Sequence, residues 1–184
     1  GVDNLNNMLG YNFRLGEIEC AIGIEQLKKL STLVLMRQKS AERLTQGLSN
    51  LRGLRLPTIK DGCTHAFYGY RMVVDVDLLG VSRELLVKVL AAEGVPGLGL
   101  GYANIHRLPM YQKKIAYGSH GFPWTLKESR NDISYKKGIC PNAEELHDKT
   151  FIGFGLCNHQ LSDIDIDLIV SSFQKVWCNI RELR

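Results

Sequence analysis

The sequence predicts an α/β fold, and three patterns support this prediction. Apolar residues recur at helical spacing near the start of the chain, and those in residues 41–51 have the 3-4-3 spacing of an amphipathic helix that faces a core. Residues 66–76 are rich in aromatic and β-branched side chains, which favours a central strand. Residues 166–180 again place their apolar side chains on one helical face.

The first helical stretch begins the predicted architecture. A helix over residues 17–30 continues into the pattern over residues 41–51, so the two together predict a long helical arm that can bend. Gly53 is typical of a helix C-terminus, and Pro57 prevents continuation of the helix. We therefore expect residues 54–56 to enter a short strand.

After the central strand, the chain has the signals of a second helix. Ser82 is a typical N-cap, the leucines and valines that follow it face inward, and Gly94 with Pro96 ends the helix. A short strand over residues 96–102 then returns to the sheet. This strand, helix, strand order is typical of a small α/β layer.

The last third of the chain divides into a turn-rich segment and a helix. Residues 103–142 are rich in Gly, Pro and aromatic side chains, and loops of this length are usually functional. Residues 142–149 favour a short helix, and residues 150–156 favour a short strand. Ser162 and Asp165 resemble a capping box at the start of the final helix.

Length and composition bound the class of protein. The chain has 184 residues, 45% of them hydrophobic and 23% charged, which suits one sizeable domain. No apolar run approaches the roughly 20 residues of a membrane span. The net charge of +4 is scattered along the chain, which argues against a dedicated nucleic-acid binder but not against binding a phosphate.

The five cysteines are odd in number and show no C-x-x-C spacing. Cys20 and Cys178 fall on predicted apolar helix faces, where a free thiol behaves as a small hydrophobic group. We therefore expect the cysteines to stay reduced and the protein to be in the cytoplasm.

Two familiar motifs are not supported by their spacing. Cys63 with His65, and Cys157 with His159, form C-x-H pairs, whereas structural zinc sites usually draw ligands from wider pairs, so we expect no metal site. The glycines of residues 97–101 resemble a nucleotide loop but do not lead into a helix, so tight turns or a backbone crossing are the expected use.

Residues 10–14, Gly-Tyr-Asn-Phe-Arg, run directly into the first helix. They bring the amide of Asn12 and the guanidinium of Arg14 close to a helix start, which suits an anionic ligand. A plain helix lead-in explains the same residues. Among the histidines, only His106 lies within a cluster of turn-forming, aromatic and basic residues, over residues 102–111.

Taken in order, seven segments of the chain resemble the C-terminal part of the DegT-type sugar-nucleotide aminotransferases. The resemblance covers nearly the whole chain, and the ordered spacing of the segments is more specific than any one of them. The segments are residues 10–14, 17–27, 37–51, 67–68, 90–95, 102–111 and 140–145.

This resemblance implies a fold-type I enzyme that uses pyridoxal phosphate (PLP). It implies that residues 1–52 form a lead-in and helical arm, and that residues 53–184 form a small C-terminal domain with a short, mostly antiparallel sheet packed by helices. The Schiff-base lysine would lie in an N-terminal domain outside this chain, so no catalytic residue is expected here.

The resemblance also implies roles for individual residues. Asn12 would reach the PLP phosphate in the active site of the other subunit of a homodimer, and Arg14 would line the same site. Tyr102 and His106 would lie near the substrate. The implied reaction moves an amino group from an amino acid, glutamate, to a keto-sugar nucleotide, and the chain alone would be inactive. A stand-alone, non-catalytic binding or dimerisation module is the alternative.

Overall fold

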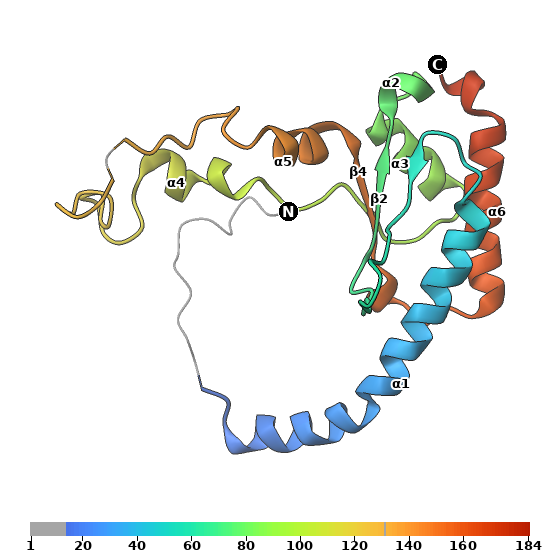
Figure 1. Ribbon diagram of the computed structural model, residues 1–184, viewed down its shortest axis with the longest axis horizontal. Coiled ribbons are helices and arrows are strands. Elements are labelled where there is room, and N and C mark those ends of the chain that lie inside the picture. Colours follow the sequence, from blue (N-terminus) through green and yellow to red (C-terminus); the bar gives the residue numbers. More distant parts are fainter. Residues whose placement is uncertain (1–13, 131) are drawn as a thin grey trace. The chain divides into compact units, whose positions relative to one another are not determined.

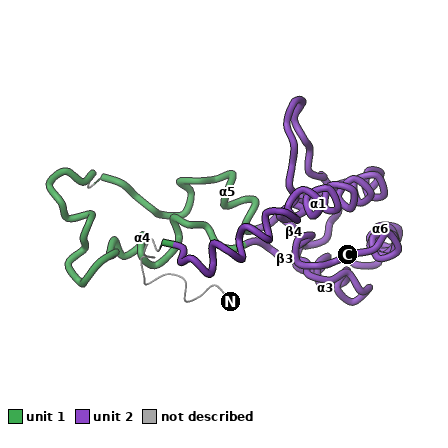
Figure 2. The backbone as a smooth tube through the Cα atoms, turned by 90° about the horizontal axis from the view of Figure 1, so that it is seen from below, with its two compact units in different colours: residues 1–14, 102–148 green, residues 15–101, 149–184 purple. Residues whose placement is uncertain are grey.

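The computed structural model describes residues 14–130 and 132–184, which divide into two compact units (Figure 2). Residues 15–101 and 149–184 form the first, which we call the sheet unit. Residues 102–148 form the second, which we call the inserted unit. The boundary expected between residues 52 and 53 stays a prediction.

Helix α1 (Glu17–Leu48) is one continuous helix of 32 residues, so the two predicted stretches are joined without a break (Figure 1). Gly16 precedes it in extended conformation. Two glutamates in the first turn interact favourably with the positive end of the helix dipole and stabilise the start of the helix. Its last turns bury Ala41, Leu44 and Leu48, as the 3-4-3 spacing predicts. The apolar side chains of its first half are exposed in this chain.

The sheet has four short strands in the order β1-β2-β4-β3, and every pairing is antiparallel. Its central pair is the longest, with Tyr70 opposite Phe154. The predicted, mostly antiparallel sheet is therefore confirmed. The strands are β1 (Leu54–Arg55), β2 (Tyr70–Val74), β3 (Leu98–Gly99) and β4 (Phe151–Phe154).

The other helices of the sheet unit begin at side-chain caps. Helix α3 starts after Ser82, whose hydroxyl accepts from the Leu85 N–H at 3.2 Å. Helix α6 starts with the predicted capping box of Ser162 and Asp165. The elements are α2 (Val76–Leu79), α3 (Arg83–Ala92), η3 (Leu156–Asn158), α6 (Asp163–Cys178) and η4 (Ile180–Leu183).

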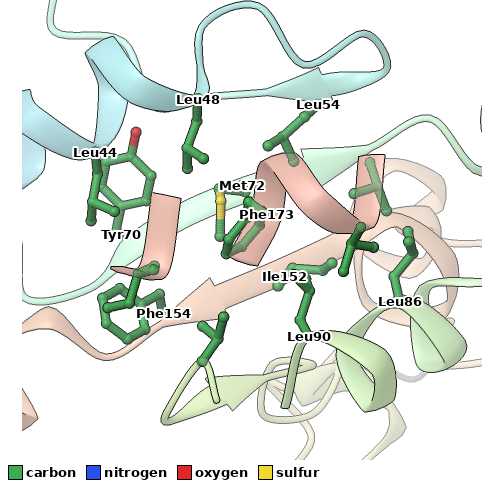
Figure 3. Packing of buried hydrophobic residues seen from close by; sticks show 14 of the residues in the cluster. Leu44, Leu48, Leu54, Tyr70, Met72, Leu86, Leu90, Ile152, Phe154 and Phe173 are labelled. Atoms are coloured by element: carbon green, nitrogen blue, oxygen red, sulfur yellow. The ribbon is translucent and has the colours of Figure 1, made fainter. Parts of the chain in front are cut away.

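One hydrophobic core lies between the sheet and helices α1, α3 and α6 (Figure 3). Its largest fully buried side chains include Tyr70, Phe154 and Phe173. The Tyr70 hydroxyl lies 2.7 Å from the Thr45 hydroxyl, and burial raises the pKa of Tyr70 more than this hydrogen bond lowers it. Every residue of the core cluster belongs to the sheet unit.

The inserted unit is built from short elements and turns. Its aromatic side chains pack on one another, since the ring of Tyr111 lies 6.1 Å from Trp124 and 5.2 Å from Tyr135. The Trp124 indole N–H also donates to the Tyr135 hydroxyl at 3.0 Å. The elements are η1 (Ile105–Arg107), α4 (Pro109–Lys113), α5 (Pro141–Glu145) and η2 (Leu146–Thr150).

The expectation for two cysteines is wrong, because Cys20 and Cys178 are both exposed. Cys20 lies in the first half of α1, which nothing in the described chain covers. Cys178 follows the buried Val176 by two positions, and two helical residues apart do not share a face. None of the helices in the described ranges combines the length and the hydropathy needed to cross a lipid bilayer.

Candidate functional site

The inserted unit contains a polar cavity of about 500 Å³. Its wall begins at Tyr102, follows η1 to the start of α4, and is completed by Lys137 and by residues of α5 and η2. Short helices and turns expose backbone and polar side chains together, which explains the polar lining. The lining residues are Tyr102, Ala103, Asn104, Arg107, Leu108, Pro109, Lys137, Glu144, His147 and Asp148.

A buried carboxylate, that of Glu144, lines this cavity. Pro141 occupies the first turn of α5, and this fixed start places Glu144 where the turn before the helix folds back onto it. The Gly138 N–H donates to both Glu144 oxygens at 2.8 Å, and the Cys140 N–H lies 3.4 Å from Oε1. His106 Nε2 is 2.8 Å from Glu144 Oε1. Glu144 therefore joins η1 to α5.

The charge of Glu144 is set by opposing effects. Burial acts to raise its pKa, but the Gly138 N–H and the His106 ring stabilise the ionised form, so that the pKa of Glu144 is lowered overall. An ionised carboxylate only accepts hydrogen bonds. The hydrogen between the two side chains consequently sits on His106 Nε2, which donates to Glu144.

A second ion-paired group lines the mouth of the cavity. Lys137 Nζ lies 2.7 Å from Asp148 Oδ2, and His147 Nδ1 lies 3.1 Å from Asp148 Oδ1. These two hydrogen bonds lower the pKa of Asp148 to about 2, and the same carboxylate raises the pKa of Lys137. The Nε2 atom of His147 is 3.3 Å from the Tyr102 carbonyl oxygen. Lys137 is thus held as an ammonium ion.

Arg107 and Asn104 line the cavity in a different way. Within residues 14–130 and 132–184, neither the Arg107 guanidinium nor the Asn104 amide has an ion pair or a side-chain hydrogen bond. Guanidinium and amide N–H groups are the donors that bind carboxylates and phosphates. With Lys137 beside them, they make this cavity suited to an anionic group.

The predicted site residues fall in different places. Tyr102 lines the cavity, and 69% of its surface is exposed. The side chain of His106 is only 10% exposed and points to Glu144, so it lies behind the cavity wall. Arg14 is exposed ahead of α1, and Asn12 lies outside the described residues. The predicted roles of all four stay predictions.

Sequence reasoning missed most residues of the cavity. Glu144 had a usable signal, an acidic residue in the first turn of a helix that begins with Pro141. Arg107 is adjacent to His106, but no sequence pattern pointed to Arg107 itself. The Lys137–Asp148 pair spans eleven positions of turn-rich chain, and no spacing rule connects such residues.

The two C-x-H pairs make local contacts. His65 Nδ1 accepts from the Phe67 N–H at 2.8 Å, and the ring of His159 stacks on Phe154 at 6.1 Å. In the described part of the chain, no three His, Cys, Asp or Glu side chains gather as a metal site. Gly97 and Gly101 have φ of +60° and +99°, a backbone conformation that favours glycine, and Gly99 lies in strand β3.

The comparisons with known proteins define the class first. Residues 2–151 match the DegT/DnrJ/EryC1/StrS aminotransferase family, so the chain belongs to this family, whose members are PLP-dependent. The family expected from the sequence is thereby confirmed.

Two relatives show how much of the family's length is present. The spore coat polysaccharide biosynthesis protein SpsC of Bacillus subtilis is 28% identical over 125 residues, which are 68% of this chain and 32% of SpsC. The dTDP-4-dehydro-2,6-dideoxy-D-glucose 3-dehydratase of Saccharopolyspora spinosa is 30% identical over 105 residues, 57% of this chain and 22% of that enzyme. The chain therefore spans about a third or less of these two relatives.

Solved structures show the same fold. The aminotransferase TlmJ from Streptoalloteichus hindustanus matches with a TM-score of 0.63 at 24% identity, over 87% of this chain and 36% of TlmJ. Helicobacter pylori PseC, an aminotransferase of pseudaminic acid biosynthesis, matches with a TM-score of 0.64 at 20% identity, over 93% of this chain and 40% of PseC. These similarities confirm the expected α/β fold class of the fold-type I aminotransferases.

The lysine of the cavity does not fit the role of a Schiff-base lysine for the family's cofactor. A lysine that forms an aldimine must lose its proton, and depressed pKa values favour that. Lys137 has a raised pKa because Asp148 holds its ammonium. Lys137 is therefore suited to binding an anion as a cation and not to forming an aldimine.

Proposed function

We propose that this chain is the C-terminal part of a cytoplasmic, PLP-dependent aminotransferase. The enzyme transfers an amino group from an amino acid, glutamate, to a keto-sugar nucleotide. The match of residues 2–151 to the aminotransferase family carries this proposal. The spore-coat polysaccharide role in the name of SpsC supports a sugar substrate, and the partial coverage of SpsC and of the 3-dehydratase supports a PLP domain elsewhere in the protein.

Within this proposal, the chain contributes binding and orientation rather than covalent chemistry. PLP supplies the electron sink when bound. The cavity at Arg107 and Asn104 receives an anionic group of the substrate, and Tyr102 contributes an exposed aromatic ring to its wall. His106 acts through its hydrogen bond to Glu144 and positions η1, which carries Arg107.

The proposal also assigns the start of the chain. Asn12 and Arg14 contact the PLP phosphate and the substrate in the shared site of a homodimer, as the resemblance implies. An amide donates a hydrogen bond to phosphate, and a guanidinium balances its charge.

The test uses the full-length protein that contains this chain, supplied with PLP, glutamate and a panel of keto-sugar nucleotides. Formation of an aminated sugar nucleotide together with 2-oxoglutarate, detected by mass spectrometry, is the expected result. Loss of turnover in Arg107→Gln with unchanged PLP absorbance would place the defect in substrate binding. Binding of a sugar nucleotide without any turnover would favour the non-catalytic module instead.

A second candidate reaction has its own supporting observation. The relative from Saccharopolyspora spinosa is named a 3-dehydratase, although it belongs among the similar sequences. The alternative reaction is elimination of water from the sugar, in which a hydroxyl group and a neighbouring hydrogen leave together. Glutamate labelled with ¹⁵N separates the two reactions, because only amino transfer places the label in the product. An unlabelled, dehydrated product would replace the aminotransferase proposal.

A further inference from the structure

The sheet of the sheet unit has one face outside the hydrophobic core. Along β2, Tyr70, Met72 and Val74 are buried against the helices, while Arg71 and Val73 alternate with them and are half-buried. Opposed residues of antiparallel strands share a face, so Gly153 of β4 lies beside Arg71. Arg71 is thus the polar side chain at the centre of this second face.

The Arg71 side chain is held between two aromatic rings. Its guanidinium carbon lies 5.9 Å from the centre of the Tyr68 ring and 5.7 Å from the centre of the Phe151 ring. Both distances are within the range of cation–π attraction. A flexible side chain is therefore fixed in one place by two neighbours.

Two glycines form the floor beneath this guanidinium. A Cβ atom at Gly69 would lie 2.5 Å from the Arg71 guanidinium carbon, and one at Gly153 would lie 2.5 Å from Nη1. Any larger residue at either position would displace the group. Gly99, the next residue across the sheet, leaves open space, since a Cβ there would come within 4 Å of only the Gly153 carbonyl oxygen, at 4.0 Å. We call Arg71 with Tyr68, Phe151, Gly69 and Gly153 the Arg71 platform.

The guanidinium N–H groups of Arg71 have no hydrogen-bond acceptor among the residues that the structure describes. No hydrogen bond or ion pair joins its guanidinium to any residue of 14–130 or 132–184. The four strands contain two arginines, Arg55 and Arg71, and no acidic residue. The face therefore carries positive charge, with donors left for a ligand.

We propose that the Arg71 platform binds an oxyanion, a carboxylate or a phosphate, of a small molecule. A guanidinium matches both groups with paired N–H donors. Because the rings already fix its position, binding costs little additional side-chain entropy. The Arg71 platform belongs to the sheet unit, and the proposal for it does not depend on the reaction proposed above.

The test follows the backbone amide resonances of residues 71 and 153, which wild type and both variants share, by NMR in the full 184-residue chain, titrated with inorganic phosphate and, separately, with succinate. Saturable shifts are expected with at least one probe. Gly153→Ala keeps Arg71 but puts a methyl group where its guanidinium now lies. Arg71→Lys keeps the positive charge but removes the paired N–H donors of the planar guanidinium. We expect each variant to bind roughly tenfold or more weakly, the size of a lost charge-assisted hydrogen bond.

Arg55→Gln is the matched control, because it removes the other positive charge of the same face without touching the Arg71 platform, and it should weaken binding much less than Arg71→Lys does. The circular dichroism spectrum of each variant establishes that it is folded. Tighter binding of phosphate assigns phosphate esters as the ligand class, and tighter binding of succinate assigns carboxylates. Absence of saturation with both probes, or equal affinity in wild type, Gly153→Ala and Arg71→Lys, would overturn the proposal.

Discussion

The two units of this chain are stabilised in different ways. The sheet unit contains the whole hydrophobic core, with side chains such as Phe173 and Leu86 at 1% and 0% exposure. In the described part of the inserted unit, the one buried residue is Glu144, a carboxylate satisfied by backbone N–H groups and a histidine. Apolar burial specifies the first unit, and a polar network with an aromatic cluster specifies the second.

This difference explains why polar groups contribute to the wall of the candidate cavity. A close-packed core leaves no room for a ligand, whereas short elements joined by hydrogen bonds leave polar groups facing open space. Regions with few buried apolar contacts also open at lower free energy than the core does. We expect the inserted unit to be the less protected part of the chain, and the following changes test this.

The largest effect should come from the core. Phe173→Ala removes a ring that is 1% exposed, and the free energy of unfolding should fall by about 3–5 kcal/mol. Denaturant titration followed by circular dichroism measures it. Leu168→Ala on the same helix is the control, because that side chain is 62% exposed and should cost less than about 0.5 kcal/mol. Equal costs would contradict the assigned core face of α6.

Two glycines of α1 should respond with opposite signs. A Cβ at Gly47 would lie 2.6 Å from both methyl groups of Val170, so Gly47→Ala should destabilise the chain by about 1–3 kcal/mol through overpacking. A Cβ at Gly23 meets nothing within 4 Å, so Gly23→Ala should stabilise the helix by about 0.5–1 kcal/mol. Thermal unfolding of both variants tests the close packing of α1 against α6.

Glu144→Gln addresses the polar network directly. The amide cannot match a carboxylate that accepts from Gly138, Cys140 and His106 together, so we expect hydrogen exchange at Gly138 to accelerate about tenfold. Exchange of the β2 amides should not change. Glu128→Gln, at an exposed position, is the control. Unaltered exchange at Gly138 would show that Glu144 does not hold this unit together.

The smallest effect is a shift in titration. The pKa of Asp148 is about 2, below its ordinary 3.8, so its contribution to stability is present above pH 3.8 and is lost as the pH falls towards 2. Carboxyl ¹³C NMR should give a midpoint near 2. Lys137→Met removes the main cause of the shift, and the midpoint should rise towards 3.8. A midpoint that does not move would exclude this ion pair in solution.

Local signals in the sequence predicted the elements of the sheet unit well. Ser82, Ser162 and Asp165 cap helices through contacts three residues away, so their effect is readable from spacing alone. The central strand was predicted too long, over residues 66–76. Phe67 has φ of +47° and donates its N–H to the ring of His65, so the chain turns before β2 begins at Tyr70.

The candidate site was less predictable, because its parts come together only through turns. Tyr102 belongs to a recognisable segment, and it does line the cavity. Lys137 and Asp148 meet across the start of α5, and Glu144 meets His106 across 38 positions of sequence. Contacts of this kind depend on the path of the backbone, which no periodicity records.

The way the inserted unit is attached has a consequence for how such proteins diversify. Both of its ends lead to adjacent strands of one sheet, since Gly99 of β3 pairs with Gly153 of β4. A segment that leaves and returns at paired residues can be lengthened, shortened or exchanged while the ladder beneath it persists. Recombination between homologues at these two points would exchange the whole inserted unit, with its cavity, while the fold of the sheet unit stays the same.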